Sequence, residues 1–295
     1  MKLPVYCAVA LGLTALASAQ PGKQSGRSQA SVSYIVLQDA EKDSLIGISS
    51  EGKLVSTIAN GAGGVALTAD KDGNYIVAGK SRLLRVSPSG AVSTVATAPG
   101  GAQWNAVAAE PDGSFLVADV NAPGIWHVAP DGMVASEPEF QRIIRYPATI
   151  LGLAVDEATG ARSVLFDSGA RFLRLLRQSG NGASVEVRLQ GAELRSPAGF
   201  ASDGSGGFLV TANVGLGVYR ISPDGGVSRF ADLPNTEGEA AALTRSAVGE
   251  IVVFAPYAQS LVRLNADGSR RDIISLPRSI QFFAAAVIPF PENKR

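Results

Sequence analysis

A glycine turn recurs along this chain at a nearly constant interval, and this repeat limits the possible folds more than any other feature of the sequence. Its six copies each follow an apolar run and read Ser50-Glu51-Gly52, Pro88-Ser89-Gly90, Pro130-Asp131-Gly132, Gln178-Ser179-Gly180, Pro223-Asp224-Gly225 and Ala266-Asp267-Gly268. The glycines are about 43 residues apart on average, a period typical of propeller-type repeats. The repeat predicts an array of similar supersecondary units.

A second turn precedes five of the six. Its copies are Asp72-Gly73, Asp112-Gly113, Thr159-Gly160, Ser205-Gly206 and Val248-Gly249, and in each unit it lies 17 to 20 residues before the first kind of turn. Tight hairpin turns demand positive φ, which a Cβ resists, so glycine is the expected residue at these places. Each unit is therefore predicted to contain two hairpins at fixed positions.

Short runs with the composition of strands lie between the turns. In the second unit they cover residues 64–69, 74–78, 82–87 and 91–96. Four antiparallel strands in a unit of this length are typical of a β-propeller blade. We predict an all-β protein with almost no helix, since a sandwich or a solenoid explains neither the phased turns nor the split first unit described next.

The first unit contains only three strands and one of the two turns, over residues 34–59. Residues 280–289 resemble the innermost strands of the other units but have no strand after them. We predict that this C-terminal strand joins the N-terminal blade and closes a six-bladed ring, which would remove open sheet edges. The propeller is expected to span residues 32–290, followed by a tail at 291–295.

The N-terminus has the pattern of a secretory signal peptide. Lys2 precedes an apolar run over residues 5–16, which ends in Ala17-Ser18-Ala19, a small-x-small cleavage site. The run is too short for a membrane span. We expect a signal peptide at 1–19, a flexible polar leader at 20–31, and an exported protein that is periplasmic or secreted.

Composition excludes several classes of function. The chain has 295 residues, with 26 basic side chains against 26 acidic ones, so it lacks the positive charge that nucleic-acid binding needs. Its only cysteine, Cys7, lies in the signal segment, and it has one histidine. A zinc module, a disulfide framework and a cysteine nucleophile are therefore excluded, and no membrane span is expected in the mature chain.

The segment from Trp104 to Val128 shows the most specific motif, with Leu116-Val117-Ala118-Asp119, then Asn121, then Ile125 and Val128. It resembles an NHL-type unit. Over nearly the whole mature domain, the chain is similar to the six-bladed propellers of the NHL-repeat and SMP-30/gluconolactonase-like superfamily. Such folds host many unrelated activities, so the resemblance implies the fold more strongly than a function.

The same resemblance implies a divalent metal over the central channel of SMP-30-type lactonases, held by a Glu, an Asn and an Asp. Asn105 stands where that family carries a substrate-contacting asparagine. The three metal ligands would fall near Leu151, Ala198 and Gln281, and none of these is the expected ligand. We therefore expect no metal site of the family type and no cofactor, with Ca²⁺ as the cation to test.

Ligands of propellers usually lie on the face where each innermost strand begins, which we call the top face. Predicted ligand-binding residues there are Trp104, Asn105, Asp119, Asn121, Asp167, Asn213 and Gln281, with Gln103, Arg171, Tyr257 and Gln259 as further top-face candidates. Trp104 could stack on a ligand or cover the core. Asp119, Asp167 and Asn213 occupy equivalent places in successive blades, so they could also be hairpin caps.

Glu237 and Glu239 are the candidate catalytic pair. Residues two apart on a strand point the same way, so both carboxylates could reach the channel mouth and serve as an acid and base or hold a cation. The alternative is two solvated carboxylates in a loop. His127 is interpreted as structural, because no Asp or Ser pattern surrounds it in the sequence.

Residues 142–195 are locally basic. They hold eight arginines and no lysine against five acids. This pattern indicates a solvated blade face, with an anion- or partner-binding patch as the alternative.

These observations favour a monomeric propeller that acts as a binding or scaffolding module for a protein, a glycan or a small molecule on its top face. The competing prediction is a hydrolase of lactonase or esterase type, or a lyase, with a non-standard site in the central channel.

Overall fold

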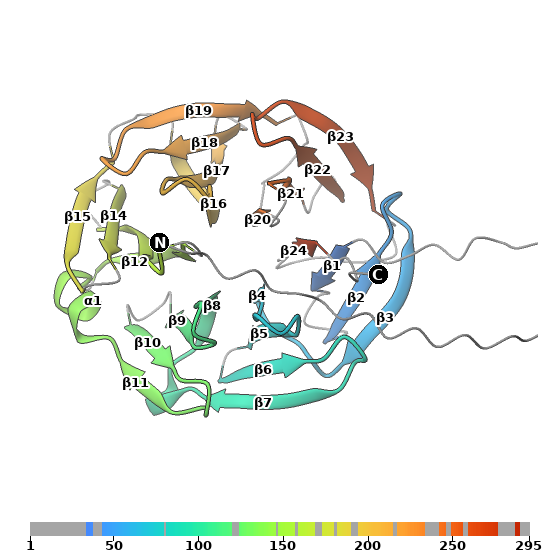
Figure 1. The fold of residues 1–295 in the computed structure, drawn as a ribbon, viewed down its shortest axis with the longest axis horizontal. Helices are drawn as coiled ribbons and strands as arrows, with labels where there is room; N and C mark the ends of the chain where they lie inside the picture. Colours follow the sequence, from blue (N-terminus) through green and yellow to red (C-terminus); the bar gives the residue numbers. More distant parts are fainter. Residues whose placement is uncertain are drawn as a thin grey trace, which may run out of the picture.

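A computed structural model describes residues 34–37, 43–79, 81–119, 124–145, 147–156, 159–168, 173–179, 182–189, 194–214, 217–233, 242–245, 249–255, 259–276 and 287–289. Their strands form four-stranded antiparallel sheets placed around a common axis (Figure 1). The all-β propeller and the antiparallel four-stranded blade that the repeat predicted are both confirmed. The predicted signal peptide, leader and C-terminal tail lie outside the described residues.

Five blades are each built from four consecutive strands. They are β4 (Ala66–Ala69), β5 (Tyr75–Gly79), β6 (Arg82–Val86) and β7 (Val92–Thr97); β8 (Trp104–Ala109), β9 (Phe115–Asp119), β10 (Gly124–Val128) and β11 (Val134–Ser136); β12 (Thr149–Val155), β13 (Arg162–Asp167), β14 (Leu173–Gln178) and β15 (Ser184–Arg188); β16 (Arg195–Ser202), β17 (Phe208–Val214), β18 (Gly217–Ile221) and β19 (Val227–Asp232); β20 (Ala242–Arg245), β21 (Ile251–Ala255), β22 (Ser260–Leu264) and β23 (Arg270–Ser275). In the first of these blades, each observed strand lies within two residues of its predicted range.

A further four-stranded sheet combines the two ends of the described chain. Its order is β24-β1-β2-β3, with β1 at Tyr34–Leu37, β2 at Ser44–Ile48, β3 at Leu54–Asn60 and β24 at Val287–Pro289. The register places Tyr34 opposite Pro289 and Val36 opposite Val287. Three strands from the N-terminal unit thus share a sheet with one strand from the C-terminal segment, which pairs with β1.

Two short helical segments interrupt the strands. The α-helix α1 covers Pro138–Ile143 and the 3-10 helix η1 covers Pro99–Gly101. Phe140 on α1 is buried, which explains why a helix forms in a chain predicted to have almost none. No helix in the described part of the chain is long and apolar enough to cross a membrane.

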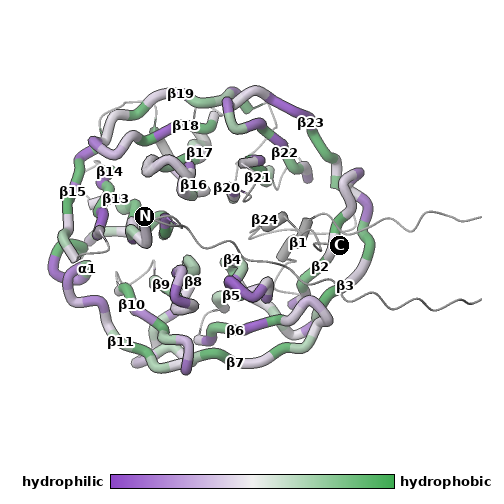
Figure 2. The backbone as a smooth tube through the Cα atoms, viewed as in Figure 1, coloured by the Kyte–Doolittle hydropathy of each residue, from purple (hydrophilic) through white to green (hydrophobic). Residues whose placement is uncertain are grey.

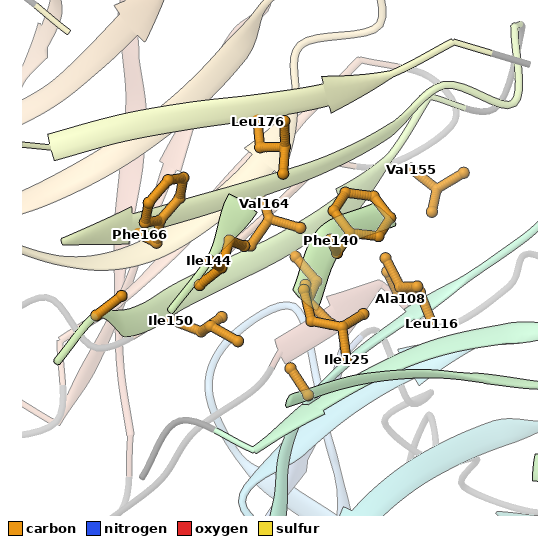
Figure 3. Close-up of a cluster of buried hydrophobic side chains, with 13 residues drawn as sticks. Ala108, Leu116, Ile125, Phe140, Ile144, Ile150, Val155, Val164, Phe166 and Leu176 are labelled. Atoms are coloured by element: carbon orange, nitrogen blue, oxygen red, sulfur yellow. The ribbon is translucent and has the colours of Figure 1, made fainter. Parts of the chain in front are cut away.

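Hydrophobic clusters fill the spaces between consecutive sheets. Hydrophobic residues are distributed over strands on all sides of the central axis rather than gathered in one place (Figure 2). The cluster between the β8–β11 and β12–β15 blades contains Phe140 and Ile144 from α1 and the segment after it, together with Ile150, Val164 and Phe166 (Figure 3). Burial of this apolar surface is the main force that holds neighbouring blades together.

Strand β2 packs on both sides. Ile46 and Ile48 belong to one cluster with Phe254 of the β20–β23 blade, whereas Leu45 belongs to another with Val77 of the β4–β7 blade. The alternation of side chains along a strand allows β2 to contact both neighbours.

The glycines of the repeated turns do more than supply positive φ. Gly90 has a φ of +90°, and a Cβ at this position would lie 2.1 Å from the carbonyl oxygen of Ile58 on β3. A Cβ on Gly132 would likewise lie 2.4 Å from the carbonyl oxygen of Val95 on β7. The turn between the third and fourth strands of these blades therefore lies against the outermost strand of the preceding sheet. Glycine is required there because a side chain would clash with the backbone of that strand.

Candidate functional site

The innermost strands β4, β8, β12, β16 and β20 surround a central cavity of about 300 Å³. Most of the residues that line it are alanine, glycine, valine and leucine, because large side chains at these positions would fill the space. The polar side chains in the lining are Thr68, Asn105, Ser202 and Thr244, and none of the described lining residues is ionisable. A cavity of this size can hold a small molecule or one segment of a larger ligand.

Three consecutive innermost strands carry a register irregularity at their starts. The irregularities lie between Trp104 and Ala106, between Ile150 and Gly152, and between Pro197 and Phe200. They place Asn105, Leu151 and Ala198 in the wall of the cavity. The resemblance assigns these positions to a substrate-contacting asparagine and to two of the three metal ligands. Bulges re-aim side chains next to binding sites, but here only Asn105 brings a polar side chain.

Two of the predicted ligand-binding residues belong to the protein interior. Trp104 is fully buried in a cluster with Phe115 and Val117, and its ring lies 6.3 Å from that of Trp126. Asp119 is 3% exposed and accepts a hydrogen bond of 2.8 Å from the backbone N–H of Gln103. Burial favours the core interpretation for Trp104 and a structural role for Asp119, which ties the end of β9 to the start of β8.

The structure describes some of the other predicted top-face residues but not all of them. Asp167 is half-buried at the end of β13, with Thr149 and Leu173 as its neighbours in register. Asn213 lies on β17, but its side chain is not among those described. Gln103 is exposed, and Gln259 has a φ of +44° just before β22. The candidates that lie outside the described residues are Asn121, Arg171, Glu237, Glu239, Tyr257 and Gln281.

Sequence reasoning missed a set of buried carboxylates at the opposite ends of the innermost strands. They are Asp70, Glu110, Asp156 and Asp203, all at most 9% exposed. The signal was an acidic residue three or four positions before the glycine in four of the five second turns. Buried carboxylates must be paired and hydrogen-bonded, and the partners of these groups show whether they are available for chemistry.

Glu110 joins two blades. It accepts hydrogen bonds from Arg162 of β13, at 2.5 Å from Nε and 3.2 Å from Nη2, and from the hydroxyl of Ser114 at 2.8 Å. Burial opposes the charge on Arg162, but Glu110 and Glu137 outweigh it and raise the pKa of the guanidinium. A carboxylate held by this many donors is suited to an inter-blade tie rather than to proton transfer.

His127, the single histidine, belongs to the same cluster. Its Nε2 lies 3.4 Å from a carboxylate oxygen of Glu110. The sequence showed no acidic partner because Glu110 is 17 residues earlier and reaches His127 only through the pairing of β8, β9 and β10. The structural interpretation of His127 fits this position, away from the cavity wall.

Asp203 is held in a similar way within its own blade. Burial favours its neutral form, but hydrogen bonds from the backbone N–H groups of Ser205 and Gly207 and from Arg220 outweigh burial and lower the pKa of the carboxyl. The Arg220 Nε lies 2.7 Å from Asp203 Oδ2. Asp70 pairs with Arg85 on the equivalent strand of the β4–β7 blade, at 3.2 Å. These carboxylates stabilise hairpins.

A metal centre has no support in the described part of the chain. Within those residues, no group of three or more His, Cys, Asp or Glu lies close enough together to hold a metal ion. The lining of the cavity offers only amide, hydroxyl and backbone oxygens, a set poor in the carboxylates that Ca²⁺ usually takes. A Ca²⁺ site therefore stays a prediction that depends on the residues not described.

Solved structures share this fold at low sequence identity. A chain in a nidogen/laminin complex superposes with a TM-score of 0.66 at 12% identity, covering 87% of this chain and 98% of that one. Virginiamycin B lyase from Staphylococcus aureus superposes with a TM-score of 0.58 at 15% identity, covering 83% and 84%. A catalytically inactive histidine-to-alanine variant of that lyase, solved with quinupristin, covers 90% and 94% at the same identity and TM-score.

No protein-family model matches the sequence, and no curated protein matches it either. The superpositions show that the chain shares the β-propeller fold with these neighbours, and identities this low show nothing beyond the fold. One neighbour is a lyase and another is part of a protein–protein complex. Function has to be argued from the site.

Proposed function

We propose that this chain is an exported propeller of the NHL/SMP-30-like type, and that it acts as a monomeric binding or scaffolding module for a protein, a glycan or a small molecule on its top face. The signal-like N-terminus supports export to the periplasm or outside the cell. The fold neighbours include a propeller from a protein–protein complex, which is consistent with a binding role.

We also propose that the sheet β24-β1-β2-β3 acts as a sixth blade that closes the ring. Its support is the packing of β2 against both the β20–β23 blade and the β4–β7 blade. Gly52, between β2 and β3, adds to this support, since a Cβ there would lie 2.1 Å from the carbonyl oxygen of Ser275 on β23. Closure would protect the sheet edges at both ends of the chain.

The observation that carries the binding proposal is the composition of the cavity wall. General acid–base catalysis needs a titratable group within hydrogen-bond reach of the reacting atom, and the described wall offers none. Two of the buried carboxylates, Glu110 and Asp203, are held by arginine at the other ends of the strands, and Asp119 accepts a hydrogen bond from the backbone N–H of Gln103. A wall of small side chains with one amide fits recognition of a neutral group better than chemistry on it.

The experiment is a ligand-binding screen on the mature protein, by thermal shift against panels of glycans, small molecules and candidate partner proteins. A ligand of the cavity should lose at least tenfold in affinity with Asn105→Leu. The matched control is Asn265→Leu, because Asn265 lies in the exposed turn before β23 and bonds only locally to Ser269 among the contacts described. Equal effects of the two substitutions would place the ligand elsewhere.

The competing proposal is a hydrolase of lactonase or esterase type, or a lyase, that uses Glu237 and Glu239. The structural similarity to virginiamycin B lyase supports an enzyme as the alternative. It predicts turnover of a lactone, ester or cyclic-peptide substrate that Glu239→Gln abolishes, and stoichiometric Ca²⁺ or another divalent metal by elemental analysis if the pair holds a cation. A metal-free protein that turns over none of these substrates would leave the binding module as the better proposal.

A further inference from the structure

The connection between the sheet β24-β1-β2-β3, which we call the composite sheet, and the next blade begins with a chemically labile dipeptide. Asn60 is the last residue of β3, and Gly61 follows it. Asparagine is among the thermolabile residues of proteins, and a following glycine has no Cβ to hinder attack of its backbone nitrogen on the asparagine side chain. The surroundings of this pair decide whether the reaction can occur in the folded chain.

The reacting atoms of the pair are accessible. Asn60 and Gly61 are both exposed, and the Asn60 side chain makes no hydrogen bond among the described residues. Within the same part of the chain, the backbone N–H of Gly61 donates to no acceptor, and a Cβ on Gly61 would meet no atom within 4 Å. Asn60 occupies the final position of the β2–β3 ladder, opposite Ser44. The rotation that brings its side chain to the Gly61 nitrogen therefore opens only a ladder end, where local opening costs least.

A second Asn-Gly pair provides an internal comparison. Its glycine, Gly182, has a φ of +82°, against +72° for Gly61, and a Cβ there would also meet no atom within 4 Å. The backbone N–H of Gly182, however, donates to the carbonyl oxygen of Ser179 at 2.8 Å. This hydrogen bond must break before the nitrogen can attack the side chain of Asn181, which itself lies outside the described residues. The two pairs thus have the same sequence but differ in how free the attacking nitrogen is.

We propose that Asn60 is a site of spontaneous modification, at which the side-chain amide is lost as ammonia and the residue becomes aspartate or isoaspartate. The Gly61 nitrogen forms a bond to Cγ of Asn60, the bond between Cγ and Nδ2 breaks, and the Gly61 amide proton leaves with the ammonia. Water then opens the resulting cyclic imide. Addition at Cγ gives aspartate, whereas addition at the backbone carbonyl carbon gives isoaspartate, whose main chain runs through Cβ and Cγ.

The isoaspartate product would disturb the segment that follows. It lengthens the main chain by one carbon atom just before Ala62, which is fully buried and donates its backbone N–H to the carbonyl oxygen of Asp43 at 2.9 Å. Gly63 is closely packed as well, because a Cβ there would overlap the carboxylate of Asp43. The extra atom and the new negative charge therefore enter a connection whose next residues are held in place.

This connection joins the composite sheet to its neighbour. It leads from β3, the outermost strand of the composite sheet, to β4, the innermost strand of the next blade (Figure 1). Ala62 shares a buried cluster with Leu45 of the composite sheet and Val77 of the β4–β7 blade. We therefore expect modification at Asn60 to weaken the packing of these two sheets, whatever the central cavity binds.

Peptide mapping of the mature protein after incubation at mildly alkaline pH measures the modification. Trypsin releases Asn60 in the peptide of residues 54–71 and Asn181 in the peptide of residues 178–188, each with a single asparagine. Mass spectrometry detects the replacement of NH by O. In the folded protein, Asn60 should be modified about fivefold faster than Asn181, the factor that one ordinary hydrogen bond accounts for. In urea the two rates should become nearly equal, because the structural difference is lost.

Substitutions connect the modification to its effect on stability. Incubated wild-type protein should unfold at a lower urea concentration than fresh protein. Asn60→Gln keeps an amide but disfavours ring closure, so its denaturation midpoint should not change on incubation. Asn181→Gln is the matched control and should lose stability on incubation as the wild-type chain does. Each variant is compared with its own fresh sample, so an initial effect of the substitution on folding does not enter the result.

Three results would overturn the proposal. Modification of Asn60 no faster than that of Asn181 in the folded protein would contradict the argument from the free nitrogen, and this comparison needs no substitution. The same ratio of rates in folded and urea-unfolded protein would show that the structure does not select the site. Unchanged stability of a fully modified wild-type sample, or a loss that persists in Asn60→Gln, would show that modification does not act on the packing of the composite sheet.

Discussion

Alanine substitutions at the turn glycines separate two physical reasons for glycine in this repeat. Gly73 and Gly90 have nearly the same backbone conformation, with φ of +81° and +90°. A Cβ on Gly73 would meet no atom within 4 Å, whereas a Cβ on Gly90 would lie 2.1 Å from the carbonyl oxygen of Ile58. Gly73→Ala therefore tests positive φ alone, and Gly90→Ala tests positive φ together with close approach of two blades.

The expected magnitudes follow from these contacts. A left-handed conformation costs an alanine about 1 to 2 kcal/mol, and the loss of flexibility in the unfolded chain returns about 0.4 to 1 kcal/mol. Gly73→Ala should therefore lower the free energy of unfolding by about 1 kcal/mol. Gly90→Ala must also move two backbones apart by about 1 Å, and overpacking of this kind costs about 1 to 3 kcal/mol more.

Urea denaturation of the two variants beside the wild-type chain measures the difference. Gly52→Ala adds a test of ring closure, because the contact that its Cβ would make is with Ser275 of the β20–β23 blade. If the composite sheet docks there in solution, Gly52→Ala should cost as much as Gly90→Ala. Equal costs for Gly73→Ala and Gly90→Ala would refute the close-approach argument, and a cost for Gly52→Ala no larger than that for Gly73→Ala would refute docking of the two sheets.

Three further substitutions test the buried polar groups. Arg162→Met should lower the free energy of unfolding by about 2 to 4 kcal/mol, because it leaves the nearly buried carboxylate of Glu110 without its main partner; if Glu110→Gln in the same chain recovers none of this loss, the ion pair is not the cause. Asp203→Asn should cost about 1 to 2 kcal/mol at neutral pH, since Arg220 and backbone donors lower the pKa of this carboxyl. That contribution is complete above the ordinary carboxyl pKa and disappears as pH falls through the lowered value, so a pH-independent difference in denaturation midpoints would contradict it. Burial raises the pKa of Tyr75 to about 12, so Tyr75→Phe should reduce the loss of stability between about pH 10 and 12, and identical alkaline profiles would show that this phenol does not matter.

The architecture was predictable because the signals that define it are local. Turn glycines, strand composition and spacing depend on residues within one unit, so the strands of the β4–β7 blade were predicted to within two residues. The composite origin of one sheet also followed from the missing strand in the first unit. In contrast, α1 was missed because the burial of Phe140 depends on the neighbouring blade.

The candidate site was less predictable, because its residues act through contacts between distant parts of the chain. Trp104 looked available for a ligand at the start of a strand, yet it packs against residues of β9 and β10. His127 seemed isolated in the sequence, and its carboxylate partner Glu110 directly follows β8, two strands before the strand of His127. Among the candidates that the structure describes, Asn105 is the one that lies in the cavity wall.

The sequence by itself determined a repeated four-stranded unit, since hairpin turns and alternating strands are encoded by neighbouring residues. Only the tertiary structure decided which partner each charged side chain meets. Ion pairing depends on register and on the approach of one blade to the next, as Arg162 and Arg174 show. Arg162 reaches the buried carboxylate of Glu110 in the preceding blade, while Arg174 pairs with Glu186 on the next strand of its own blade.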